Sequence, residues 1–295
     1  MARVAAEINS TRASENEVLV LDCGDLFFKS RCPTELRPKT ILFAMKKMGY
    51  DAINVADGEL SFGQEFFLSQ AKVTGLPFLS ANLRLEKDDA GVIKPYLLRK
   101  ISGRTIAVTG LIAPTLLPKD AEKNGVRISS VAESLKRVLT EVRGKGARFV
   151  ILLSHMGYDA TKDFLMLNDI EGVDIAIAGH GRNFTSSVAF VNKTALVQNS
   201  FGGEHLGKVT IQLDEPSIQK RYQLENIVLT EEYPDDPEIQ KIIYDLRRQE
   251  GERDEKLRLD KKKQEEEKER GEILKMSPEE FINKVKKEQQ TTIGQ

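Results

Sequence analysis

Two aspartates and two histidines of this 295-residue chain each follow an apolar segment and lie close to a glycine. They are Asp25, Asp57, His155 and His180, in the loops GD, ADG, SHMG and GHG. If the preceding segments are parallel strands, the four loops share the sheet edge at which ligands bind in open α/β folds. Two carboxylates and two imidazoles gathered there suit a divalent transition metal such as zinc, manganese or iron.

Each of these residues also has an ordinary structural interpretation. Aspartate is common in turns because its side chain makes local hydrogen bonds, so Asp25 could simply cap the next helix. His155 and His180 could likewise be polar caps at helix starts. The agreement of four loops favours the metal site. The third histidine, His205, follows no comparable strand end, and we predict a structural or surface role for it.

The segments that must position these loops are short and apolar. Residues 17–25 (EVLVLDCGD) predict a strand buried on both faces, which ends where Gly24 lets the backbone turn. Further strands are predicted at 51–55, 77–83, 96–101, 105–111, 149–153, 173–178, 189–191, 194–198 and 208–213. Amphipathic helices are predicted at the N-terminus and at 33–48, 59–74, 130–145 and 160–168. This alternation predicts a layered α/β fold with mixed strand direction in its later part.

The composition changes near Pro234, which predicts a domain over residues 1–233 and a tail over 234–295. Residues 247–270 are almost all charged and have no apolar stripe, so they predict either a solvated helix with i,i+4 Glu/Lys pairs or a disordered segment. Such a tail could serve as an arm that contacts a protein partner.

Bulk composition excludes several classes of partner. The net charge of −1 gives no electrostatic reason to expect nucleic acid or an anionic membrane as a partner. No stretch approaches the ~20 apolar residues of a membrane span. The two cysteines, Cys23 and Cys32, do not have metal-binding CxxC spacing. Cys23 is expected to be a small core residue, and a disulfide between the two is left open.

Four segments, LDCGD, NVADGELSFG, ILLSHMG and DIAIAGHG, resemble in order and spacing the calcineurin-like metallophosphoesterases. Within that superfamily they resemble the 5′-nucleotidase branch of bacterial exported enzymes, and the segments SANL and GGEHLGKV support this. The resemblance covers about residues 1–230. It implies a four-layer α/β/β/α sandwich with a dinuclear metal site that hydrolyses small phosphorylated substrates.

The resemblance also implies roles for individual residues. Asp25 matches the aspartate that bridges the two metals, and His155 and His180 match two histidines that complete the shell of the second metal. Asp57 stands at the position of a metal-binding asparagine, for which it is a competent oxygen ligand. One metal therefore has four expected protein ligands, and the other has only the shared Asp25.

Three departures from the family pattern weaken the expected catalyst. Gly58 replaces a histidine that stabilises the transition state or protonates the leaving group. Arg182 replaces a histidine ligand of the first metal, and it is either a contact for the substrate phosphate or an exposed loop residue. The opening DxH motif is absent, so we expect one metal per chain, or two if an upstream segment supplies further ligands.

Two functional hypotheses follow. The first is a metal-dependent phosphoesterase with a degenerate active site. The second is a non-catalytic or single-metal binding or scaffold protein that retains the fold and uses its charged tail for a partner. The base-binding C-terminal domain of the family does not follow the linker-like helix near Pro237, so nucleotide specificity is not predicted. If the N-terminus is truncated, the resemblance suggests an exported, periplasmic protein.

Overall fold

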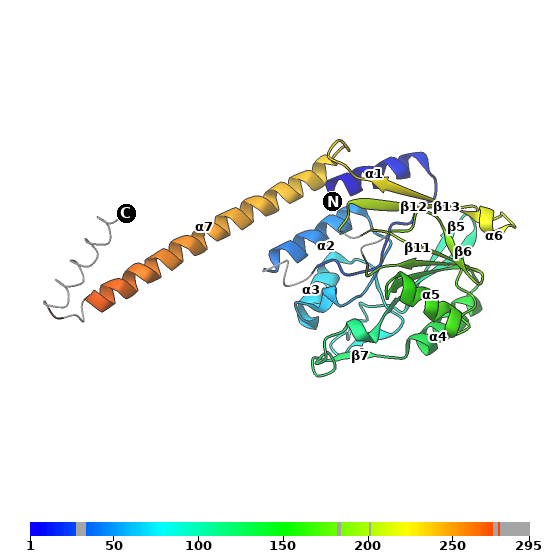
Figure 1. Cartoon of the computed structure of the whole chain (residues 1–295), viewed down its shortest axis with the longest axis horizontal. Coiled ribbons are helices and arrows are strands. Elements are labelled where there is room, and N and C mark those ends of the chain that lie inside the picture. The colour runs from blue at the N-terminus through cyan, green and yellow to red at the C-terminus, as the bar shows by residue number, and fades with distance from the viewer. Residues whose placement is uncertain (28–33, 182–183, 201, 274–276, 278–295) are drawn as a thin grey trace. The chain divides into compact units, whose positions relative to one another are not determined.

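The computed structural model describes residues 1–27, 34–181, 184–200, 202–273 and 277 (Figure 1). The chain forms two compact units, Met1–Ile243 and Tyr244–Gln295. The first unit carries every described residue of the predicted metal site.

The first unit contains two main sheets. The larger has the strand order β10 (Ala189–Val191), β11 (Thr194–Gln198), β9 (Ile175–Ala178), β8 (Ala147–His155), β6 (Arg104–Ile112) and β5 (Tyr96–Ile101). Its four central strands are parallel, and its two edge strands are antiparallel. The smaller is the parallel sheet β1 (Leu21–Asp22), β2 (Ala52–Asn54) and β3 (Phe78–Leu79). Two antiparallel pairs complete the strands, β12 (His205–Ile211) with β13 (Tyr222–Val228), and β4 (Leu83–Leu85) with β7 (Val126–Ile128).

Helices α1 (Ala2–Ser14), α2 (Leu36–Met48) and α3 (Gln64–Thr74) pack in one core, and α4 (Val131–Gly144) and α5 (Tyr158–Leu167) pack in another. The other described helices are the short α6 (Ile218–Arg221), α7 (Pro237–Ile273) and the 3₁₀ turns η1 (Gly58–Leu60) and η2 (Pro114–Leu116). Figure 1 shows α4 and α5 on one side of the first unit, away from α1, α2 and α3.

Three separate hydrophobic cores define the layers. Along β8, Val150 and Leu152 pack with α4 and α5, whereas Phe149, Ile151 and Leu153 point to the opposite face, as strand alternation requires. That second core also contains residues of β2, β3 and β13. The third core joins the outer face of β2 and β3 to α1, α2 and α3. The predicted four-layer α/β/β/α fold is therefore confirmed.

Some element predictions were wrong in detail. The strand predicted over 17–25 contains only Leu21–Asp22, and of Val18–Leu21 only Val20 is fully buried, because β1 pairs on one side only among the described residues. Gly63, with φ 86°, divides the helix predicted over 59–74 into η1 and α3. The strand predicted over 77–83 separates into β3 and β4, and the prediction omitted β7 and β13.

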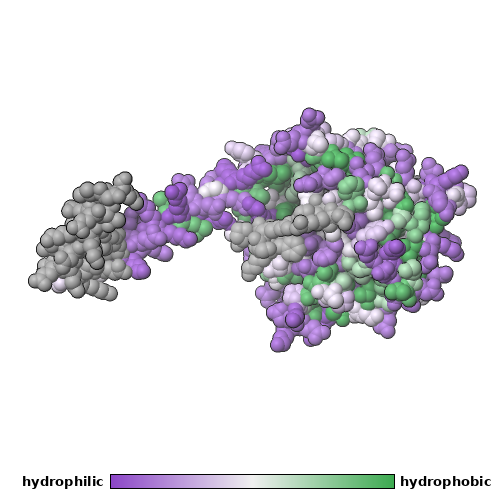
Figure 2. Space-filling view, in the orientation of Figure 1, coloured by the Kyte–Doolittle hydropathy of each residue, from purple (hydrophilic) through white to green (hydrophobic). Residues whose placement is uncertain are grey.

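The tail is helical over its described part. Its start, Ile239, Ile242 and Ile243, packs into the core of the first unit. Beyond residue 244 the helix has a largely hydrophilic surface (Figure 2) and carries i,i+4 ion pairs such as Arg248–Glu252 and Lys262–Glu266. Of the predicted alternatives, the solvated helix is the one that the structure has through Ile273.

Two smaller predictions also have outcomes here. Among the described helices, none combines the length and apolar character needed to cross a bilayer. Cys23 has a free thiol that donates a hydrogen bond to the Ile177 carbonyl at 3.2 Å, whereas Cys32 lies outside the described residues.

Candidate metal centre

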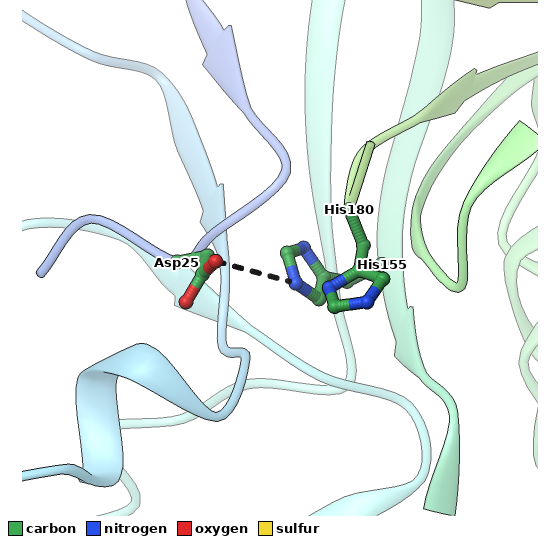
Figure 3. Close-up of side chains that lie close together, drawn as sticks. All are labelled: Asp25, His155 and His180. Carbon is green, nitrogen blue, oxygen red and sulfur yellow. Dashed lines mark ion pairs between the residues drawn. The ribbon is translucent and has the colours of Figure 1, made fainter. Parts of the chain in front are cut away.

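The two sheets bring three of the predicted ligands into one group. Asp25 follows β1, His155 is the last residue of β8, and His180 follows β9. One ligand atom from each lies within 4.8 Å of the other two. Figure 3 shows the Asp25 carboxylate facing the two imidazole rings, whose centroids are 5.1 Å apart.

The fourth predicted residue, Asp57, lies beside the same group after β2. Its Oδ1 atom is 3.7 Å from His155 Nε2, and Asp25 Oδ2 is 3.9 Å from that nitrogen. Each aspartate side chain is 19 % exposed. Burial raises the pKa of Asp57, and a hydrogen bond from its own backbone N–H and the charge of His180 lower the pKa in part.

His155 is the most buried member of the group, with a side chain that is 1 % exposed. Its Nδ1 atom lies 3.0 Å from the Cys23 carbonyl, which can only accept, so Nδ1 carries the proton. Its Nε2 atom is buried and has no hydrogen-bond partner within the described part of the chain. Burial, and then the charge of His180, lower the pKa of His155 to about 4, although the Cys23 hydrogen bond opposes this. The ring is therefore neutral near pH 7, and its unprotonated Nε2 atom, which could donate its lone pair to a cation, faces the two carboxylates.

Two of the group's residues occupy an unusual backbone conformation. Asp25 has φ 72° and His180 has φ 63°, in the left-handed region that non-glycine residues rarely adopt. Gly24, at φ 88°, precedes Asp25, and a Cβ atom there would lie 2.5 Å from the Asn54 carbonyl oxygen. Strain of this kind is concentrated at functional sites, which supports a functional interpretation of these loops.

Glu59 holds the Asp25 loop, and the sequence analysis missed it. Its side chain is fully buried, and it accepts hydrogen bonds from the N–H groups of Asp25 at 3.0 Å, Leu26 at 2.7 Å and Ala56 at 2.8 Å. Burial raises the pKa of Glu59, and these backbone hydrogen bonds lower it in part. The sequence feature that could have indicated this role is a glutamate placed between Gly58 and Leu60, at the start of an apolar helix.

Gly58 is packed directly against Asp25. A Cβ atom at position 58 would lie 2.2 Å from Asp25 Oδ1 and 2.8 Å from the Phe27 carbonyl oxygen. Because real Cβ atoms do not approach so closely, a side chain at position 58 requires Asp25 or its loop to move. The absence of a side chain at position 58 is therefore coupled to the way in which Asp25 is held.

The remaining predicted residues lie elsewhere. Arg182 is outside the described residues. The ring of His205 stacks on Phe184 with centroids 4.9 Å apart, and its structural or surface role stays a prediction. A cavity of ≈ 630 Å³ adjoins the metal group and shares His180 with it, and Tyr158, Phe184 and Gln198 also line it.

Comparisons with known proteins find distant relatives of this chain. No protein-family model matches the chain. The chain is 23 % identical over 266 residues to the 5′-nucleotidase of Bos taurus, a match that covers 82 % of this chain and 46 % of that protein. It is 25 % identical over 255 residues to the trifunctional nucleotide phosphoesterase protein YfkN of Bacillus subtilis, covering 74 % of this chain and 17 % of that protein.

Solved structures show the same fold. The calcineurin-like phosphoesterase YfkN from Bacillus subtilis superimposes with a TM-score of 0.69 at 18 % identity, covering 84 % of this chain and 88 % of that chain. A 5′-nucleotidase precursor from Thermus thermophilus superimposes with a TM-score of 0.66 at 20 % identity, covering 83 % and 52 %. The fold is therefore that of a metallophosphoesterase domain, and the Asp/His group lies within it.

The chain is a distant relative of the calcineurin-like metallophosphoesterase domains found in 5′-nucleotidases. The family resemblance predicted from the four sequence motifs is thereby confirmed. The chain spans less than half the length of these two curated relatives.

Proposed function

We propose that this domain binds one divalent transition metal through Asp25, Asp57, His155 and His180 and uses it to hydrolyse phosphate esters. The observation that carries the proposal is the convergence of Asp25, His155 and His180 within 4.8 Å at the ends of three strands. Membership of a family whose named relatives include phosphoric-ester hydrolases supports the reaction class.

The residues present fit such a metal. The Nε2 atom of His155 is buried, faces two carboxylates and lacks a hydrogen-bond partner among the described residues, as expected of an atom that awaits a cation. Two imidazoles with two carboxylates suit zinc, manganese or iron better than magnesium or calcium, which favour sites made entirely of oxygen ligands.

The protein's own groups have distinct tasks in this proposal. A bound metal would supply Lewis-acid chemistry and a nucleophile at neutral pH. His155 contributes a neutral donor held in one tautomer, and Asp25 and Asp57 contribute the negative charge that balances the cation. Glu59 fixes the backbone of Asp25 through its three hydrogen bonds, so the ligand geometry exists before the metal binds.

The proposed substrates are small phosphorylated molecules. The two curated relatives carry different substrate descriptions, one a 5′-nucleotidase and the other a trifunctional nucleotide phosphoesterase, so we propose a 5′-nucleotide only as the first compound to test. Arg182 keeps its proposed role as a phosphate contact, and it lies outside the described residues.

Metal binding and turnover can be tested together. Isothermal titration with Zn²⁺ and Mn²⁺ measures binding, and release of phosphate from p-nitrophenyl phosphate and adenosine 5′-monophosphate measures turnover. We expect near-stoichiometric binding and hydrolysis in the native protein, and loss of both in Asp25→Asn and His155→Gln. His205→Gln is the matched control, because it removes a histidine outside the metal group. Equal turnover in the native protein and Asp25→Asn would refute the phosphoesterase proposal.

A second candidate function is metal binding without catalysis. The tight contact between position 58 and Asp25 favours it, because the space that an acid/base side chain at position 58 would need is already filled. In that case the charged helix beyond residue 244 is proposed as the arm for a protein partner. Metal binding without hydrolysis in the same assays would support this second function. A protein partner that binds the full chain but not a chain truncated after Ile243 would also support it.

A further inference from the structure

One backbone carbonyl controls the orientation of His155. The Cys23 oxygen accepts a hydrogen bond from His155 Nδ1 at 3.0 Å and another from Asn54 Nδ2 at 3.2 Å. Any rotation of this peptide group would remove the acceptor from Nδ1 and release the tautomer that directs Nε2 toward the carboxylates. The direction of the Cys23 carbonyl is therefore a property of the metal site.

Asn54 is placed to hold that carbonyl. It is the last residue of β2 and is 0 % exposed, and its Nδ2 group also donates to the Leu111 carbonyl of β6 at 2.9 Å. Leu111 pairs in register with Ser154, the residue before His155 on β8. The two N–H bonds of one amide thus join the loop after β1 to the strand that lies beside His155.

The surroundings of Asn54 indicate that these bonds are the reason for an asparagine at this position. Its Oδ1 atom is buried and has no hydrogen-bond partner among the residues that the structure describes, which is an unfavourable state for a buried polar atom. A Cβ atom at position 110 would lie 2.0 Å from this oxygen, so Gly110 provides the space that the amide occupies. An aliphatic residue would fill β2 without an unsatisfied oxygen, but it could not donate to Cys23.

We propose that Asn54 is a positioning residue of the metal site. Through the Cys23 carbonyl it selects the Nδ1-protonated tautomer of His155 and fixes the ring so that Nε2 faces Asp25 and Asp57. The inference rests on the metal site of the proposed function. Partners that orient a metal-binding histidine typically change metal affinity by about 10–100-fold.

Asn82 provides a matched control. It is also a buried asparagine that bonds to β6, because its Nδ2 donates to the Ile112 carbonyl at 2.8 Å and its Oδ1 accepts from the Ile112 N–H at 3.1 Å. Among the described residues, none of its hydrogen bonds reaches Cys23 or His155. Asn54→Val and Asn82→Val therefore remove comparable buried amides, but only the first removes a bond to the Cys23 carbonyl.

Two measurements on the full chain test the proposal. Long-range ¹H–¹⁵N spectra report the tautomer of each histidine, and the chain has only three histidines, so single His→Gln variants assign the signals. Titration with Co²⁺, followed by visible absorption, reports affinity without turnover. We expect Asn54→Val to reduce the Nδ1-protonated fraction of His155 and to weaken Co²⁺ binding at least tenfold. Asn82→Val should retain the tautomer and bind Co²⁺ within about threefold of the native protein.

Equal tautomer populations and equal affinities in the two variants would overturn the proposal. If Asn54→Val does not fold, the native protein still provides a test, because finding His155 protonated on Nε2 would contradict the proposal directly. Neither measurement depends on hydrolysis, so a protein that binds Co²⁺ but does not turn over substrate would refute the phosphoesterase without refuting the role of Asn54.

Discussion

Replacing Glu59 by glutamine tests whether a buried carboxylate builds the Asp25 loop. In the native structure Oε2 accepts from the N–H groups of Asp25 and Ala56, and Oε1 accepts from that of Leu26. Glutamine has almost the same shape but only one accepting oxygen. The best placement of the amide keeps the two bonds to Asp25 and Ala56 and leaves the Leu26 N–H facing an NH₂ group.

The expected change in the free energy of unfolding follows from the number of hydrogen bonds that are lost or weakened. One buried donor without an acceptor costs about 1–3 kcal/mol, and each remaining bond weakens from the charged range of about 1.5–3 to the neutral range of about 0.5–1.5 kcal/mol. The neutral amide recovers part of this sum because it is easier to bury than a carboxylate, as the raised pKa of Glu59 indicates. We expect Glu59→Gln to lower the free energy of unfolding by roughly 2–3 kcal/mol.

Guanidinium unfolding followed by circular dichroism measures this change, and Co²⁺ titration measures its effect on the site. Glu65→Gln is the control, because the Glu65 side chain is 76 % exposed and solvent screens its ion pair with Lys87, so the pair should contribute little to stability. Equal unfolding free energies in the native protein and Glu59→Gln, within about 0.5 kcal/mol, would show that the three bonds do not stabilise the loop as argued.

Three further predictions concern the site and the tail. Gly58→Ala should push the Asp25 carboxylate aside and weaken Co²⁺ binding at least about tenfold. Gly144→Ala is the control, because position 144 has open space around it and the substitution should leave Co²⁺ binding unchanged. Equal binding by both variants would contradict the prediction. The pKa of His155 falls from about 6.5 when unfolded to about 4 when folded, so its contribution to stability is present above pH 6.5 and is lost as the pH falls from 6.5 to 4. Without metal, His155→Gln should therefore flatten the pH dependence of unfolding between pH 7 and 4 by up to roughly 3 kcal/mol, and an unchanged slope would argue against a buried neutral ring. For the tail, the helical signal is the difference in far-ultraviolet circular dichroism between the full chain and a chain ending at Ile243. This difference should shrink in 1 M salt, because salt screens the i,i+4 ion pairs of the helix. A difference that does not depend on salt would mean that other interactions stabilise the helix.

The layered fold and the group of ligands could be predicted because both depend on local patterns. Apolar strands that alternate with amphipathic helices form parallel sheets, and parallel strands bring their carboxyl ends to one edge. Three of the four predicted ligands meet there, with Asp57 beside them. Their roles as metal ligands remain predictions, because titration with metal is the observation that tests them.

The residues that support the ligands could not be predicted, since each acts through contacts between distant parts of the chain. Glu59 bonds to Asp25, 34 positions away, and Asn54 bonds to Leu111, 57 positions away. Nothing in the residues next to Asn54 distinguishes it from a polar residue at the end of a strand. The short β1 was overestimated for a related reason, because hydropathy does not report that the strand pairs on only one side among the described residues.

The contacts around Asp25 give a physical reason for the glycine at position 58. Asp25 holds φ 72° only because Glu59 binds its N–H and because Gly24 and Gly58 leave room around its loop. A histidine at position 58 would need the space that Asp25 Oδ1 occupies, so the family's acid/base group and the present position of Asp25 exclude each other in this conformation. Gly58→His alone should therefore weaken metal binding rather than create a better catalyst, because a working acid/base at position 58 also requires a rearranged Asp25 loop. Under the proposed function, the backbone around Asp25, and not the choice of ligands, therefore decides between metal binding and catalysis.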